Sequence, residues 1–150
     1  MLPDYFEDVE VGTTASFGHR TVTADEIRAF AREYDPQPFH LDEAAAEQSP
    51  FGGLIASGWH TCALTMRMLV DNVLADSAAV GAAGVDELRW PNPLRPGDTI
   101  SCEAEIVGTE PFRPTTGLVL VESVTSNDDC DAVMSMVGRI IYPRRDSEVE

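Results

Sequence analysis

An aspartate and a histidine lie close together in the segment Asp35-Pro36-Gln37-Pro38-Phe39-His40. A carboxylate and an imidazole can share the removal and return of a proton around one water, provided that both side chains point at it. Pro36 and Pro38 restrict the backbone between the two residues and lower the entropy lost when their side chains are held in place. Asp35 and His40 are therefore a candidate acid–base pair whose pKa values would be coupled.

The same two residues also have purely structural interpretations. Asp35 could accept backbone hydrogen bonds in an Asx turn after a helix, and His40 could be a partly buried histidine. Other candidate sites have weaker support. The remaining histidines show no paired metal-ligand spacing, the three cysteines form no C-x-x-C pair, and Ser57-Gly58 lacks the G-x-S-x-G frame of a nucleophile elbow. We expect no metal site and no disulfide.

Asp35 should lie at the end of a helix. Thr23 followed by Glu26 is a capping box, which predicts that the helix begins there. Apolar residues then recur on one helical face at Ile27, Phe30, Ala31 and Tyr34. Pro36 prevents the helix from continuing, because the residue before a proline avoids the α region. Residues 41–47 should form a further short helical turn.

A second, longer helix is expected from Ser57 or Gly58 to Leu74. It is apolar on nearly all sides between residues 59 and 70, a pattern that predicts a buried helix. Strand-like runs cover residues 13–22, 85–90, 99–110, 118–127 and 132–142, so the last four should form an antiparallel meander. The prediction is a single α+β domain over residues 1–150, a curved antiparallel sheet around one long buried helix. Its exposed edge strand could pair between two subunits.

The charge balance excludes several classes of partner. The chain has 26 acidic and 10 basic residues, a formal net charge of −16, and every basic residue is arginine. Nucleic acids and anionic membrane surfaces are therefore not expected partners. Acidic residues spread along the whole chain, together with the absence of lysine, favour a halophilic protein of a high-salt cytoplasm. The first residues show neither a basic start nor an apolar stretch, so we expect no signal peptide and a cytoplasmic location.

Three segments, in this order, resemble stretches of one family, the MaoC-like dehydratases or (R)-specific enoyl-CoA hydratases. The segment Tyr34–Asp42 is similar to their hydratase motif, in which an aspartate and a histidine flank four residues. Residues 51–58, Phe-Gly-Gly-Leu-Ile-Ala-Ser-Gly, resemble the stretch that leads into the family's central helix. Residues 89–99 resemble its later strand-turn-strand segment. The resemblance covers roughly residues 5–143.

The resemblance implies the hotdog fold, in which a sheet wraps a long helix, and at least a homodimer. It implies hydration of trans-2-enoyl-CoA to (R)-3-hydroxyacyl-CoA, or the reverse dehydration, with Asp35 and His40 as the catalytic pair. The backbone N–H of Gly58 would stabilise the thioester oxygen, and Ser57 and Met66 would belong to the substrate-binding region. No cofactor or metal would be needed, because CoA arrives as part of the substrate.

Two positions depart from the family pattern. Gln37 replaces the usual asparagine, and Met66, with Thr65 beside it, stands where a serine supports the pair. A bulky Met66 would shorten the acyl pocket and favour short acyl chains. Two alternatives stay open: a thioesterase on the same fold, whose carboxylate activates water against the carbonyl, and a non-catalytic acyl-CoA-binding subunit. Candidates for contacting the phosphates of CoA are Arg89, Arg95 and Arg113.

Overall fold

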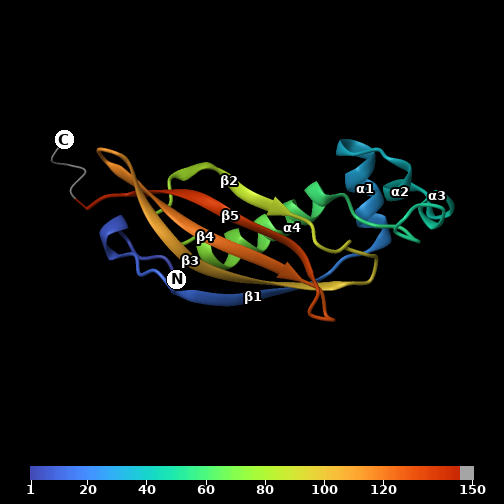
Figure 1. The fold of residues 1–150 in the computed structure, drawn as a ribbon, viewed down its shortest axis with the longest axis horizontal. Coiled ribbons are helices and arrows are strands. Elements are labelled where there is room, and N and C mark those ends of the chain that lie inside the picture. The colour runs from blue at the N-terminus through green and yellow to red at the C-terminus, as the bar shows by residue number, and fades with distance from the viewer. Residues whose placement is uncertain (146–150) are drawn as a thin grey trace.

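A computed structural model describes residues 1–145 as a five-stranded antiparallel sheet that curves along one long helix (Figure 1). Residues 146–150, the end of the expected domain, lie outside the described residues. The strands are β1 (Thr14–Thr21), β2 (Gly81–Arg89), β3 (Thr99–Arg113), β4 (Thr116–Ser126) and β5 (Ala132–Pro143). A 3-10 turn, η1 (Phe6–Asp8), precedes them. The predicted fold class, an antiparallel sheet with one long helix, is confirmed.

The order of the strands in the sheet is β1-β3-β4-β5-β2. The predicted four-stranded meander is therefore wrong: only β3, β4 and β5 form one, while β2 pairs with β5 at the far edge. Residues 90–98 lead from β2 at one edge to β3, the strand next to the other edge, and are held by backbone hydrogen bonds, from Ala56 to Leu94 at 2.8 Å and from Gly97 to Val22 at 2.7 Å. Alternating hydrophobicity identifies a strand but carries no information about its neighbour, which is why the pairing of β2 was missed.

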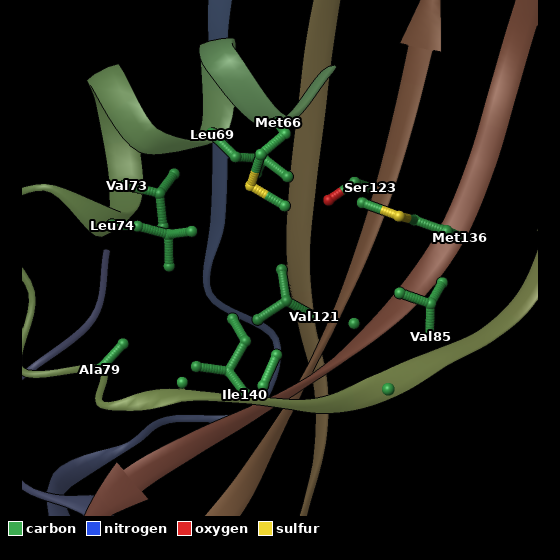
Figure 2. Close-up of a pocket in the computed structure, with 14 residues that line it drawn as sticks. Met66, Leu69, Val73, Leu74, Ala79, Val85, Val121, Ser123, Met136 and Ile140 are labelled. Atoms are coloured by element: carbon green, nitrogen blue, oxygen red, sulfur yellow. The ribbon is translucent and has the colours of Figure 1, made fainter. Parts of the chain in front are cut away.

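The long helix α4 (Gly58–Leu69) continues into a π-helical segment, η2 (Val70–Leu74), over the predicted range. The helix is buried less completely than its apolar pattern indicated, since the exposed fractions of Trp59, Met66 and Val70 are 59%, 46% and 38%. Met66 and Leu69 line an apolar cavity of about 350 Å³ between this side of α4 and the strands β4, β5 and β2 (Figure 2). No strand among the described residues lies beyond β2, and the helix face beside that edge is left uncovered.

Three short helices gather at one end of the sheet, beyond the start of α4 (Figure 1). They are α1 (Ala24–Tyr34), α2 (Pro38–Leu41) and α3 (Glu43–Glu47). The capping box at Thr23 and Glu26 begins α1 as predicted. The helical turn predicted over residues 41–47 is present as α3, and a further turn, α2, precedes it because the fixed φ of Pro38 suits the first helical position. None of the helices within residues 1–145 is long and apolar enough to cross a membrane.

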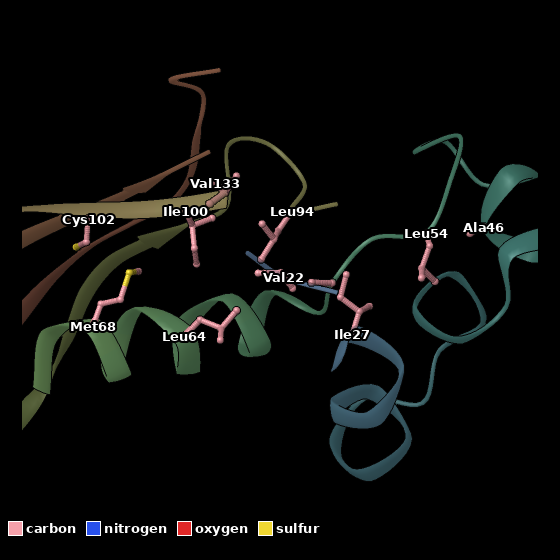
Figure 3. Close-up of a cluster of buried hydrophobic side chains, with 11 residues drawn as sticks. Val22, Ile27, Ala46, Leu54, Leu64, Met68, Leu94, Ile100, Cys102 and Val133 are labelled. Atoms are coloured by element: carbon pink, nitrogen blue, oxygen red, sulfur yellow. The ribbon is translucent and has the colours of Figure 1, made fainter. Parts of the chain in front are cut away.

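One hydrophobic cluster joins the short helices to the rest of the molecule (Figure 3). Ile27 of α1 and Ala46 of α3 share it with Leu64 and Met68 of α4. Other members come from the loops and the sheet: Val22, Leu54, Ala56, Leu94, Ile100, Cys102 and Val133. Dense packing of this kind resists displacement, so the end of α1 and the start of α4 are held at fixed positions. Asp35 and Gly58 belong to these two helix ends, and His40 lies in α2 between them in the chain.

Candidate active site

Asp35 is the C-cap residue of α1, as the sequence predicted. Its backbone N–H donates to the carbonyl oxygen of Ala31 at 2.9 Å, and Pro36 ends the helix. The carboxylate contacts side chains rather than the backbone N–H groups of an Asx turn. Its Oδ1 accepts a hydrogen bond from Nε2 of Gln37 at 2.6 Å, and its Oδ2 lies 3.2 Å from Nε2 of His40.

His40 lies in the short helix α2 and is almost fully buried, with 4% of its surface exposed. Its Nδ1 lies 2.7 Å from the carbonyl oxygen of Ile55. A carbonyl oxygen can only accept a hydrogen bond, so Nδ1 must carry the proton. Nε2 is therefore the nitrogen that faces Asp35 and can gain or lose a proton.

The surroundings of Asp35 favour its charged form. Burial pushes the pKa of this carboxyl up, but the Ser57 hydroxyl, the Gln37 amide and His40 lower it by more. The pKa of Asp35 consequently lies below its ordinary value of 3.8. At neutral pH the pair contains a carboxylate, which is able to accept a proton.

The beginning of α4 supplies the third part of the site. Ser57 is the N-cap residue, and its buried hydroxyl accepts a hydrogen bond from the backbone N–H of Trp59 at 3.3 Å. Gly58 is the first helical residue, so its N–H has no partner within the helix. A Cβ atom at Gly58 would lie 2.5 Å from the Trp90 ring, whose Nε1 donates to the Gly58 carbonyl at 2.9 Å. Glycine is required here for packing as well as for access.

Asp35, His40 and Gly58 line one cavity of about 350 Å³. Trp59 and Trp90 also line it, with their rings edge to face and their centroids 5.4 Å apart. A carboxylate at the end of α1, an imidazole nitrogen of α2 and a free N–H at the start of α4 therefore face one space. That arrangement can hold a water between two proton-transfer groups and place hydrogen-bond donors beside a developing negative charge.

The other two residues of the predicted site lie elsewhere. Ser57 is fully buried beside Asp35 and supports the carboxylate, and it is not among the residues that line the cavity. Met66 lines the separate apolar cavity of Figure 2, two helical turns further along α4. The neighbouring Thr65 is buried and hydrogen-bonded to the hydroxyl of Thr125 at 2.7 Å, so it is not a substitute for the missing serine.

Sequence reasoning missed three features of the site. The carbonyl oxygen of Ile55, which sets the protonated nitrogen of His40, is a backbone atom and leaves no signal in the sequence. Gln37 was noted as a departure from the family pattern, but its contact with Asp35 was not foreseen. The chain contains only two tryptophans, one in a family-like segment and one directly after another, and this scarce large aromatic residue is a signal that could have pointed to Trp90 and Trp59.

Comparison with known proteins places the chain in a family. Residues 8–128 match the family model of the MaoC like domain. The chain is 32% identical over 130 residues to the 3-hydroxybutyryl-CoA dehydratase of Methylorubrum extorquens, covering 83% of this chain and 80% of that protein. It is 30% identical over 133 residues to the (R)-specific enoyl-CoA hydratase of Rhodospirillum rubrum, covering 81% and 89%.

A solved structure agrees with the sequence relatives. The crystal structure of a MaoC-like dehydratase from Rhodospirillum rubrum matches with a TM-score of 0.85 and 45% identity, covering 94% of this chain and 97% of that one. The resemblance noted in the sequence is thus confirmed at the level of fold and family. The chain belongs to the MaoC-like hydratase and dehydratase family.

Proposed function

We propose that the chain catalyses the reversible hydration of trans-2-enoyl-CoA to (R)-3-hydroxyacyl-CoA. One observation carries the proposal: His40 Nε2 and Asp35 Oδ2, 3.2 Å apart, line the same cavity as the first residue of α4. The names of two relatives, an (R)-specific enoyl-CoA hydratase and a 3-hydroxybutyryl-CoA dehydratase, support the reaction class and the thioester substrate.

The reaction follows from what each group can do. A water held between Asp35 and Nε2 of His40 loses a proton to the pair as its oxygen bonds to the β-carbon of the enoyl group. The pair returns one proton to the α-carbon, so water is added across the double bond and the protonation state of the enzyme is restored. Negative charge that develops on the thioester oxygen is stabilised by the N–H of Gly58 at the positive end of α4.

A homodimer is part of the proposal. Strand β2 is at the edge of the sheet, and nearly all of its residues are exposed. An edge strand with free N–H and C=O groups is a template for pairing with another chain. Val85 on β2 and Trp90 just after it are 49% and 42% exposed, so apolar surface accompanies the open edge. Pairing of two β2 strands would extend the sheet across two subunits and cover this surface.

The test is an assay of crotonyl-CoA hydration at high salt, following loss of the conjugated enoyl absorbance and the configuration of the product. We expect the wild type to form the (R)-3-hydroxy product, and Asp35→Asn and His40→Ala to lose activity. Matched controls on the surface are Asp25→Asn and His19→Ala, which should retain it. Inactivity of the wild type across acyl chain lengths would overturn the proposal.

The same assay separates the two alternatives. A thioesterase would release free thiol from acyl-CoA substrates while the double bond persists. A non-catalytic binding subunit would bind acyl-CoA with no turnover, and Asp35→Asn would affect binding alone. The dyad and the free N–H of Gly58 favour the hydratase, because addition of water to an enoyl thioester needs both proton transfers and stabilisation of the thioester oxygen.

A further inference from the structure

We propose that Arg95 binds a phosphate group of the pantetheine-linked substrate at the rim of the active-site cavity. The inference rests on the proposed function, because it identifies the residue that would hold the anionic end of the thioester. CoA carries a diphosphate and a further phosphate on its ribose, whereas the chain has a formal net charge of −16. A highly negative protein needs a local cation, free of carboxylate partners, to hold such a ligand.

Most of the arginines are already neutralised by carboxylates. Within residues 1–145, seven of the ten arginines have a carboxylate oxygen within 4.0 Å of a guanidinium nitrogen. Arg89, at the end of β2, is one of them, because Glu87 lies 3.7 Å away. The three arginines outside these pairs are Arg32, Arg95 and Arg113.

The positions of these three residues distinguish them. Arg113 ends β3 and stacks on the Phe112 ring at 4.8 Å. It is fourteen residues along β3 from Thr99, roughly 45 Å away, at the end of the sheet opposite the three short helices (Figure 1). Arg32 is exposed to solvent on α1. Arg95 is half-buried and lies directly after Leu94, a residue that lines the cavity of Asp35 and His40.

Contacts with the chain fix the position of the Arg95 guanidinium. One Nη2–H donates to the carbonyl oxygen of Phe51 at 2.6 Å, and Phe51 also lines the cavity. Nη1 comes so close to Gly53 that a Cβ atom there would lie 3.4 Å from it. The nearby Asp98 carboxylate accepts a hydrogen bond from the backbone N–H of Arg95 at 2.9 Å. This carboxylate therefore stabilises the loop and does not pair with the guanidinium.

Most of the hydrogen-bonding capacity of Arg95 is therefore unused. A guanidinium has five N–H donors, and one of those of Arg95 has an acceptor among the described residues. A planar, fixed fork of donors is the geometry that suits phosphate oxygens. Arg95 thus combines an uncompensated charge, free donors and a place between two cavity-lining residues, Phe51 and Leu94.

The experiment compares three thioesters with the same enoyl group: the CoA, phosphopantetheine and pantetheine derivatives. For the CoA thioester we expect Arg95→Gln to raise KM about 10- to 100-fold with kcat little changed. KM for the pantetheine thioester, which has no phosphate, should be unaltered. Arg95→Lys should recover part of the loss because it keeps the charge, and Arg113→Gln, an unpaired arginine at the distant end, should behave like the wild type.

The phosphopantetheine thioester identifies the phosphate. If Arg95→Gln impairs it as much as the CoA thioester, the group bound is the phosphate next to pantetheine, which CoA and a carrier protein share. If it behaves like the pantetheine thioester, the group is one that CoA alone carries. Equal losses on all three substrates, or an unchanged KM for the CoA thioester, would overturn the proposal.

Binding separates this inference from the hydratase proposal. Trp59 and Trp90 are the only tryptophans of the chain and both line the cavity, so their fluorescence should report CoA binding without turnover. Suppose that the wild type hydrates no thioester, binds CoA more tightly than pantetheine, and that Arg95→Gln loses this preference. These results would refute the hydratase proposal and support the phosphate site. A wild type that binds CoA no more tightly than pantetheine would refute the site.

Discussion

Replacing Gly58 by alanine should destabilise the protein through a clash with Trp90. The added Cβ would lie 2.5 Å from the indole ring, against 3.4–4 Å for an ordinary contact. The ring is held by its own hydrogen bond to the Gly58 carbonyl at 2.9 Å and by the edge of Trp59, so it cannot simply move away. Overpacking of this kind lowers the free energy of unfolding by about 1–3 kcal/mol.

An opposing effect sets the size of the expected change. Gly58 is the first residue of α4, and its φ does not require glycine. Without the clash, alanine would therefore stabilise the protein by about 0.4–1 kcal/mol, because it lowers the conformational entropy of the unfolded chain. We expect a net loss of about 1–2 kcal/mol in the presence of Trp90. In a Trp90→Ala background the same substitution should be neutral or stabilising.

The assay is a double-mutant cycle in urea unfolding at high salt, with the four proteins carrying Gly or Ala at 58 and Trp or Ala at 90. We predict that Gly58 and Trp90 are coupled by about 1–3 kcal/mol. The rate of crotonyl-CoA hydration by Gly58→Ala should fall at least ~10-fold, because displacement of the start of α4 moves the backbone N–H that must contact the thioester oxygen. An equal effect of Gly58→Ala in both backgrounds would refute the packing argument.

Three further predictions concern charge, pH and assembly. Activity and the free energy of unfolding should decrease in dilute buffer. The repulsion among charges that sum to −16 is screened only at high salt, where the screening length at ~1 M is ~3 Å. Full activity in dilute buffer would refute the halophile proposal. Burial, together with the charge of Arg20 and against that of Glu26, lowers the pKa of His60 below 6.5. As pH falls below 6.5, the unfolded chain therefore binds more protons than the folded protein, and the free energy of unfolding measured by urea titration should decrease. The decrease should be smaller in His60→Phe, whose ring could still stack on Phe30. Val85→Arg at the β2 edge should convert a dimer to a monomer in light scattering, while Val107→Arg, an exposed apolar residue of β3, should not.

The parts of the site governed by local rules were predictable from the sequence. The capping box at Thr23 and the proline at position 36 placed Asp35 at the end of α1, because both act within a few residues. The proximity of Asp35 to His40 also follows from the short connection between them. The separate turn α2 was not predicted because Pro38 can either end a loop or begin a helix, and local sequence does not choose between them.

Features that depend on distant segments were not predictable. The apolar pattern of residues 59–70 indicated a buried helix, yet the exposed fractions of Trp59 and Met66 are 59% and 46%. The position of β2 at the edge of the sheet likewise depends on its pairing with β5, a contact between segments about fifty residues apart. The clash that a side chain at Gly58 would make with Trp90 is of the same kind, since the two residues meet only in the folded chain.

In the proposed mechanism, Asp35 and His40 carry out the proton transfers of enoyl-CoA hydration. The most direct test of this mechanism is the initial rate of crotonyl-CoA hydration by Asp35→Asn, which keeps the size of the side chain but removes the group that accepts the proton. We predict a fall in kcat of about 10²–10⁴-fold, with CoA binding and the urea midpoint close to those of the wild type. An Asp35→Asn variant that folds, binds CoA and hydrates crotonyl-CoA at a rate close to that of the wild type would contradict the account.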